Sequence, residues 1–210
     1  MANIIHLKII PGLASLWIRN IKGKENIPKE KTGLIIAANH ASYIDHFIFG
    51  GIMPLATNRM IHFLAKKEHF EGAQRKWHKF LEAIPIDRQA GGKTGLEEAV
   101  KALKKGKIIA IYPEGTRTLT GKLQRAKTGI ARLALAAKVP VLPIGLIGTF
   151  EIMPKGQYYP NLKRATVNIG KLMYFKEYYG KENDKKTLRL VTTKIMREIA
   201  KLTKQKYEFD

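Results

Sequence analysis

The 210-residue sequence contains no cysteine. This absence excludes disulfide bonds, thiolate nucleophiles and cysteine-ligated zinc or iron–sulfur sites. Long hydrophobic runs are also missing, because no stretch without Asp, Glu, Lys or Arg is longer than the one from Thr32 to Ile44. A membrane-spanning helix needs about 20 predominantly apolar residues, so we expect none. We also expect no secretory signal, because no small-x-small cleavage site follows the apolar stretch Ile9–Ile18.

Acidic residues are scarce relative to basic ones. The 17 Asp and Glu residues face 38 Lys and Arg residues, which gives a formal net charge of +21. Such a field attracts nucleic acid, anionic lipid surfaces or phosphorylated small molecules. Nucleic acid is the least favoured of these partners, because aromatic residues are not interleaved with Lys and Arg and no known nucleic-acid motif is present.

Short apolar runs alternate with amphipathic segments along the chain. This alternation predicts an α/β fold: a single layered domain with a largely parallel central sheet flanked by helices. The predicted strands are Leu34–Ala38, Ile61–Ala65, Ala83–Ile86, Lys107–Tyr112, Val139–Ile147 and Ala165–Ile169. The predicted helices are Thr94–Lys105, Gly129–Lys138 and Lys185–Lys206.

The first 24 residues form an amphipathic N-terminal segment, and residues 25–210 form the predicted domain. Apolar residues of this segment are flanked by Lys8, Arg19, Lys22 and Lys24. Such a segment can lie in a membrane interface with Trp17 at headgroup depth. The alternative is a first helix, interrupted at Pro11, that packs on the sheet.

A histidine and an aspartate follow the first predicted strand directly. A strand end that runs into a helix start is where α/β proteins place reactive groups. His40 can take up and return a proton near neutrality, and a carboxylate such as Asp45, five residues on, can fix its tautomer. A buried structural pair and a metal site of His40, Asp45 and His46 are the alternatives. Because no cysteine exists and no serine lies in a Gly-x-Ser-x-Gly elbow, we expect His40 to activate a substrate hydroxyl directly.

A second polar cluster follows the strand predicted at Lys107–Tyr112. Gly115 permits a tight turn, Arg117 offers a planar fork suited to phosphate, and Glu114 can hold a substrate hydroxyl. The alternative is an ordinary polar turn in which Glu114 and Arg117 pair. Lys66 and Arg88 end two further strands, so the parallel arrangement can bring both cations to the same sheet edge.

Four ordered motifs together resemble the glycerolipid acyltransferases, the family of 1-acyl-glycerol-3-phosphate acyltransferases. They are Asn39-His40-x-Ser42-x-x-Asp45, Ile86-Asp87-Arg88, Tyr112-Pro113-Glu114-Gly115-Thr116-Arg117 and Val139-Pro140-Val141-Leu142-Pro143. The resemblance spans roughly Leu34 to Ile147. It departs mildly at Tyr112 and Thr118, where the family usually has Phe and Ser, and at Glu82, where it often has Gly.

The resemblance implies an O-acyltransferase in which His40 is the general base and Asp45 its orienting partner. It implies an acceptor site built from Lys66, Arg88, Glu114, Gly115, Thr116 and Arg117. The implied reaction moves an acyl group from acyl-coenzyme A or acyl-acyl-carrier-protein to the sn-2 hydroxyl of lysophosphatidic acid and makes phosphatidic acid for phospholipid biosynthesis. No metal or other cofactor is expected.

The expected location is peripheral, on the cytoplasmic face of a membrane with an anionic surface. Another lyso-lipid or glycerol-phosphate-like acceptor, and a binding domain without activity for nucleic acid or anionic lipid, are the alternatives. The acyl-chain length, the kind of donor and the oligomeric state are not fixed by the sequence.

Overall fold

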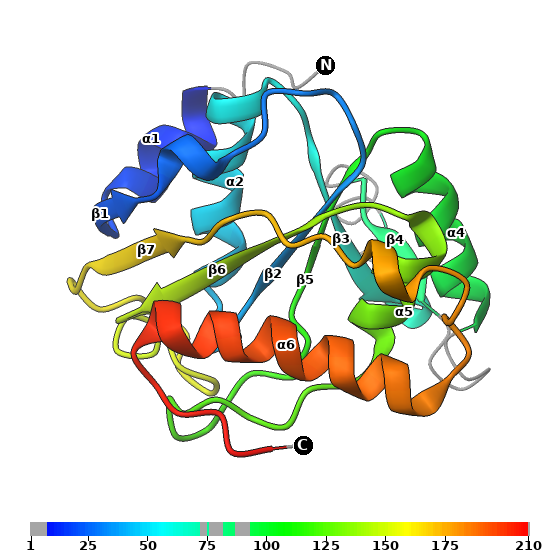
Figure 1. Ribbon diagram of the computed structural model, residues 1–210. Coiled ribbons are helices and arrows are strands. Elements are labelled where there is room, and N and C mark those ends of the chain that lie inside the picture. Colours follow the sequence, from blue (N-terminus) through cyan, green and yellow to red (C-terminus); the bar gives the residue numbers. More distant parts are fainter. Residues whose placement is uncertain (1–7, 72–74, 76–81, 87–92, 210) are drawn as a thin grey trace.

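A computed structural model describes residues 8–71, 75, 82–86 and 93–209. Its centre is a seven-stranded sheet with the order β1-β7-β6-β2-β5-β3-β4 (Figure 1). Neighbouring strands are parallel except for β6 and β7, which are antiparallel. The predicted α/β fold with a largely parallel sheet is therefore confirmed. The strands are β1 (Ile18–Lys22), β2 (Leu34–Ala38), β3 (Ile61–Lys66), β4 (Ile84–Ile86), β5 (Ile108–Ile111), β6 (Val141–Ile147) and β7 (Ala165–Ile169).

Strand β2 lies in the middle of the sheet and is buried on both faces. Its five residues are all buried, as expected of a parallel strand covered by helices on both sides. Ile35 and Ala37 pack into one apolar layer, whereas Leu34 and Ile36 pack into the other. This alternation follows from the two-residue period of a strand.

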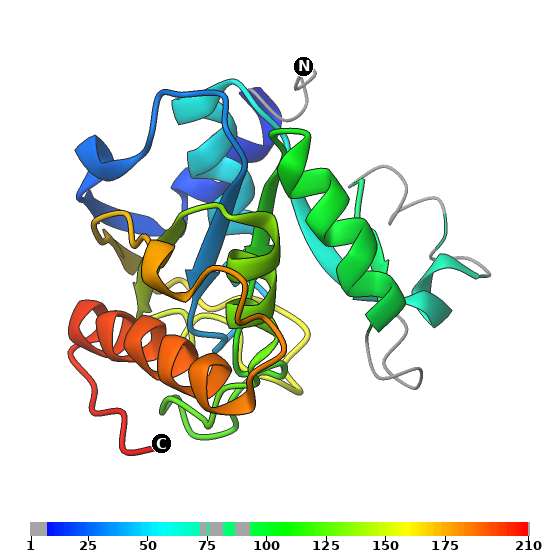
Figure 2. The ribbon, with the colours of Figure 1, turned by 45° about the vertical axis from the view of Figure 1, so that its right-hand side comes forward.

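Helices cover both faces of the sheet (Figures 1 and 2). Helix α2 contributes Ile48, Phe49 and Met53 to one layer, and the other layer contains residues of α4, α5 and α6. The three helices that the sequence predicted are present as α4, α5 and α6, and their ends lie within three residues of the predicted ends. The longer helices are α2 (Asp45–Thr57), α4 (Lys93–Lys104), α5 (Gly129–Ala137) and α6 (Lys185–Thr203).

The N-terminal segment contains a short helix and a sheet strand. Helix α1 (Ile10–Ser15) packs against α2, and a side chain at Gly51 would place its Cβ 2.5 Å from the Cβ of Ala14. Glycine is therefore needed for this close approach. Strand β1 pairs with β7 in the sheet, a pairing that local sequence did not predict. The part of the segment that can face an interface therefore ends before Ile18.

Within the part of the chain that the structure describes, no helix combines the length and the apolar character needed to cross a membrane.

Candidate active site

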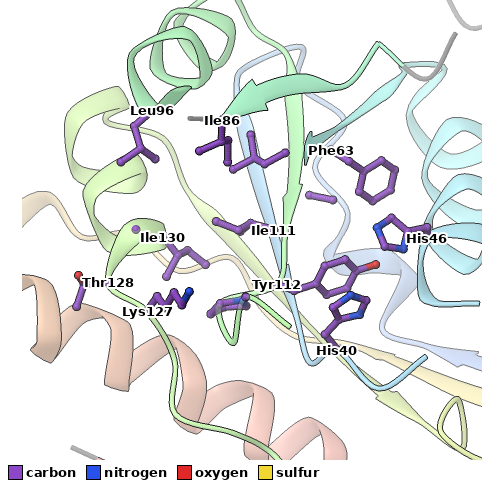
Figure 3. Close-up of a pocket in the computed structure, with 15 residues that line it drawn as sticks. His40, His46, Phe63, Ile86, Leu96, Ile111, Tyr112, Lys127, Thr128 and Ile130 are labelled. Carbon is purple, nitrogen blue, oxygen red and sulfur yellow. The ribbon is translucent and has the colours of Figure 1, made fainter. Parts of the chain in front are cut away.

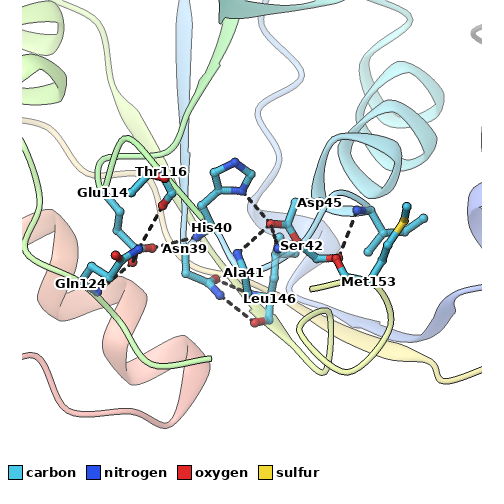
Figure 4. A network of polar contacts seen from close by, with 11 residues as sticks. Asn39, His40, Ala41, Ser42, Asp45, Glu114, Thr116, Gln124, Leu146 and Met153 are labelled. Carbon is cyan, nitrogen blue, oxygen red and sulfur yellow. Dashed lines mark hydrogen bonds and ion pairs between the residues drawn. The ribbon is translucent and has the colours of Figure 1, made fainter. Parts of the chain in front are cut away.

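The loop between β2 and α2, residues 39–44, carries His40 at the carboxyl edge of the sheet. The Nδ1 atom of His40 lies 2.9 Å from Oδ2 of Asp45, the first residue of α2 (Figure 4). The same Oδ2 atom accepts hydrogen bonds from the backbone N–H groups of Ala41 and Ser42, both at 2.9 Å. One fully buried carboxylate thus organises the β2–α2 loop and the His40 ring together.

This geometry determines which ring nitrogen of His40 is available to accept a proton. An ionised carboxylate only accepts hydrogen bonds, so the proton of the neutral imidazole lies on Nδ1 and the Nε2 atom is available to accept a proton. The His40 side chain is 11% exposed, whereas that of Asp45 is 0% exposed. The pair meets as the sequence predicted, and Asp45 is placed to stabilise the imidazolium that forms when Nε2 accepts a proton.

The polar side chains next to His40 in the β2–α2 loop are hydrogen-bonded to backbone groups. The Ser42 hydroxyl donates to the carbonyl of Met153 at 2.8 Å and accepts from the N–H of Ile44 at 3.2 Å. Ser42 is fully buried, so it is not placed as a nucleophile. The Asn39 amide bonds both the N–H and the carbonyl of Leu146, and so continues the pairing of β2 with β6 beyond the end of the strand.

Glu114 holds His40 from the opposite side, through the loop between β5 and α5 (residues 112–128). Its Oε1 atom accepts from the backbone N–H of His40 at 2.8 Å, and its Oε2 atom accepts from the N–H of Gln124 at 2.8 Å. Burial raises the pKa of Glu114 to about 7, although these N–H donors favour the charged form. Glu114 is only 4% exposed, so the geometry favours a positioning role rather than contact with a substrate hydroxyl.

Gly115 and Arg117 lie in the turn after β5. Gly115 has a φ of +75° and donates its N–H to the Tyr112 carbonyl at 3.0 Å, which confirms the predicted tight turn. The Arg117 guanidinium does not pair with Glu114; it stacks on the Tyr43 ring, 3.4 Å from the ring centroid. Sequence reasoning missed Tyr43, because a cation–π contact across 74 residues leaves no local pattern.

His40 lines a cavity of about 400 Å³ (Figure 3). Around the histidine the wall is aromatic: the His40 ring stacks on Tyr112 with centroids 3.8 Å apart and meets His46 edge-on at 5.5 Å. The cation Lys127 also lines the cavity, with its side chain against Gly115. The remaining wall is mostly aliphatic, with Leu64, Ile86, Leu96, Ala110, Ile111 and Ile130. A base, a cation and an apolar wall therefore share one cavity.

The C-terminal tail secures the β5–α5 loop from outside. Gln205 accepts from the N–H of Leu123 at 2.9 Å and donates to the carbonyl of Gly121 at 3.1 Å. The Tyr207 hydroxyl accepts from the N–H of Ala126 at 3.1 Å. The sequence predicted the helix to run to Lys206; instead α6 ends at Thr203, and the residues after it return to the active-site loop.

Two predicted cations of the acceptor site are not placed. Arg88 lies outside the described residues, and for Lys66 the structure describes only the backbone, as the last residue of β3. The Thr116 side chain is exposed, and its carbonyl accepts from the Gln124 amide at 3.0 Å. Among described residues no three His, Asp or Glu side chains form a group that could hold a metal ion.

Comparisons with known proteins show the family of the chain. A model of the acyltransferase family matches residues 18–147, more than half of the sequence. The chain therefore belongs to the acyltransferase family, which confirms the resemblance seen in the motifs.

The names of individual relatives specify the activity more closely than the family does. A 1-acyl-sn-glycerol-3-phosphate acyltransferase of Bacillus subtilis is 36% identical over 143 residues, which are 65% of this chain and 68% of that protein. The chloroplastic acyltransferase BAT2 of Brassica napus is 29% identical over 170 residues, 79% of this chain but 46% of the plant protein. The crystal structure of the 1-acyl-sn-glycerophosphate (LPA) acyltransferase PlsC from Thermotoga maritima superposes with a TM-score of 0.71 and 26% identity, covering 96% of this chain and 81% of that one.

Proposed function

We propose that this protein acylates the sn-2 hydroxyl of 1-acyl-glycerol-3-phosphate with a thioester donor and so makes phosphatidic acid. The observation that carries the proposal is the His40–Asp45 pair, whose Nε2 atom is left as a base at an apolar cavity. Among the described residues of the β2–α2 loop no cysteine or free serine lies beside it, because the sequence has no cysteine and the Ser42 hydroxyl is hydrogen-bonded to the backbone. The names of the relatives from Bacillus subtilis and Thermotoga maritima support the acceptor.

The reaction follows from a base that acts on the acceptor. The Nε2 atom of His40 removes the hydroxyl proton as the oxygen attacks the thioester carbonyl carbon. The tetrahedral intermediate then collapses, the carbon–sulfur bond breaks, and the imidazolium returns the proton to the leaving thiolate. The products are an ester and a free thiol. Asp45 stabilises the imidazolium in between.

Arg117 and Lys127 are the described cations beside this base. Arg117 is held over Tyr43, a neighbour of His40 in the β2–α2 loop, and Lys127 lines the cavity itself. A guanidinium fork binds phosphate in two hydrogen bonds, and an ammonium adds charge. We assign the binding of the acceptor phosphate to these two residues together with Lys66 and Arg88. The donor is acyl-coenzyme A or an acidic acyl carrier protein, both of which the net charge of +21 attracts.

Because the acceptor is a membrane lipid, we place the protein peripherally on the anionic cytoplasmic face of a membrane. Helix α1 and the residue that follows it support this location, because Leu13 in the helix and Leu16 at its C-terminal end are 48% and 60% exposed although both are apolar. An amphipathic segment of this kind binds at the lipid–water boundary.

The test is thiol release from acyl-coenzyme A by purified protein, with and without lysophosphatidic acid. We expect acceptor-dependent release that His40→Ala abolishes, and an acceptor KM that Arg117→Ala raises with a smaller effect on kcat. Release by folded His40→Ala at the wild-type rate would contradict the assignment of the base. If release depended only on a different lyso-lipid in an acceptor panel, the assigned acceptor would be wrong.

A further inference from the structure

The loop between β6 and β7 presents large side chains to solvent. Residues 158–164 are all exposed, and the exposed fractions are 85% for Tyr158, 82% for Tyr159 and 101% for Leu162. Single exposed apolar residues are common on protein surfaces. Three within five residues, each almost fully exposed, bury too little surface to stabilise the fold, so their presence calls for a partner outside the chain.

Hydrogen bonds within the loop hold these side chains outward. Asn161 donates its backbone N–H to the Ile152 carbonyl at 2.8 Å and its side-chain amide to the Glu151 carbonyl at 2.9 Å. The Gln157 side chain donates to the carbonyls of Ile152 and Tyr159. The exposure of Tyr158, Tyr159 and Leu162 is thus built into an ordered turn.

The loop joins the active site to helix α1. At its start, the Met153 carbonyl accepts from the Tyr43 N–H at 3.2 Å and from the Ser42 hydroxyl at 2.8 Å. At its end, Arg164 donates to the Ser15 carbonyl at 3.1 Å, next to Leu16 of the exposed α1 surface. Figure 1 shows this yellow segment beyond the ends of β6 and β7. Its exposed side chains therefore extend the apolar surface of α1 toward the β2–α2 loop.

The chemistry of the loop matches the surface of an anionic bilayer. Tyrosine is enriched at membrane interfaces, because its ring is apolar and its hydroxyl is polar. Lys155, Lys163 and Arg164 belong to the same exposed loop, and basic side chains near anionic headgroups strengthen binding. Glu151 is the one acidic residue between Gly148 and Arg164.

We propose that Tyr158, Tyr159 and Leu162 form a second membrane contact, which binds an anionic lipid bilayer together with helix α1. The proposal rests on the proposed function, because a lipid acceptor requires the active site to reach a bilayer. Helix α1 alone would leave the protein free to rotate about a single contact. Helix α1 and the β6–β7 loop are two separate contacts with the bilayer, and together they fix the orientation of the protein on the membrane. In that orientation the Tyr43 side of the β2–α2 loop lies at the lipid surface.

The test compares two surface variants in vesicle binding. The first is Tyr158→Ser/Tyr159→Ser/Leu162→Ser. The matched control is Tyr174→Ser/Leu190→Ser, which also removes exposed apolar side chains but away from the loop. Tyr174 follows Met173, which bridges to Val141 at the opposite end of β6. Both proteins are sedimented with vesicles of equal parts phosphatidylglycerol and phosphatidylcholine, and their melting temperatures verify folding.

We expect the loop variant to bind these vesicles roughly tenfold more weakly than wild type, and the control to bind as wild type does. Turnover of a short-chain monomeric acceptor should be unchanged in both variants.

Wild-type vesicle binding by the loop variant, or equal loss of vesicle binding in the control, would overturn the proposal. The proposal would also be overturned if turnover of the monomeric acceptor fell as much as vesicle binding. Such a result would mean that the substitutions disturb the β2–α2 loop through its contacts with Met153. Vesicle binding is measured without catalysis, so the two proposals can fail separately. If the wild-type protein showed no acyl transfer but the loop variant still bound vesicles more weakly, only the proposed function would be refuted.

Discussion

The two loops that meet at His40 are held in different ways. In the β2–α2 loop the ring of His40 is held by local chain, because Asp45 bonds this ring and the N–H groups of Ala41 and Ser42, all within five residues. The β5–α5 loop is fixed from outside, by Glu114 across to His40 and by Gln205 from the C-terminal tail. The orientation of the His40 ring therefore depends on local chain, whereas the loop that carries Arg117 depends also on distant chain. Changes to the two loops should then have separable effects on chemistry and on positioning.

The largest expected effect is on the β2–α2 loop. All three hydrogen bonds converge on Oδ2 of Asp45, and Oδ1 has no partner among the described residues. An asparagine can therefore keep the three bonds with its carbonyl oxygen and remove only the charge. We expect Asp45→Asn to lower kcat on the order of 10²- to 10⁴-fold, the usual contribution of a general base system, with little change in stability.

Asp45→Ala is the comparison for that experiment. It leaves two buried backbone N–H groups without acceptors, which costs about 1–3 kcal/mol for each group. Thermal melts and kcat of both variants separate the charge from the geometry. Equal destabilisation by Asn and Ala would show that the loop is not organised as described.

The stability of the second loop should depend on pH. Burial raises the pKa of Glu114 to about 7, whereas the unfolded chain has a value near 4.3. Between these values the folded protein keeps a proton that the unfolded chain has lost, so this contribution to stability is complete below about pH 4 and is lost as the pH rises to about 7. At about 1.4 kcal/mol per pKa unit, the total is on the order of 4 kcal/mol.

The measurement is the free energy of unfolding from urea titrations between pH 4 and pH 8, for wild type and Glu114→Gln. Because other groups titrate in both proteins, the quantity of interest is the difference between the two curves. We expect this difference to change in favour of the variant as the pH rises. A difference that is constant with pH would mean that the pKa of Glu114 is the same in the folded and unfolded protein, which would contradict the raised pKa.

The contrast between the loops also explains what the sequence could predict. His40 and Asp45 are five residues apart at the end of an apolar strand, so their spacing alone suggested that they meet. Strand β1 and the Arg117–Tyr43 contact could not be found in this way, because their partners lie far along the chain. The same holds for Gln205, which bonds a loop 82 residues earlier. Local patterns predicted the layers of the fold and the base, and tertiary contacts decided how the second loop is held.

The tail offers a direct test of the external support. Gln205→Ala removes two hydrogen bonds to the β5–α5 loop, worth about 1 kcal/mol each. We expect kcat/KM for the acceptor to fall by up to about tenfold, since the loop leaves its active position in part of the molecules. Most of this loss should be in KM, because the His40–Asp45 pair stays intact. Lys206→Ala, next to it, is the control; equal losses in both variants would assign the effect to the tail in general.

The smallest effect is expected where the two loops touch. Tyr112 belongs to the β5–α5 loop and stacks its ring on His40, but its buried hydroxyl has no hydrogen-bond partner among the described residues. Burial raises the pKa of this phenol, which therefore stays protonated at neutral pH. Tyr112→Phe keeps the stacked ring and removes an unsatisfied group, so kcat should be unchanged and the melting temperature equal or higher. Tyr112→Leu, which removes the stacking, should lower kcat. A tenfold loss in the phenylalanine variant would instead make the hydroxyl a participant in the reaction, and the comparison of the loops would have to include it.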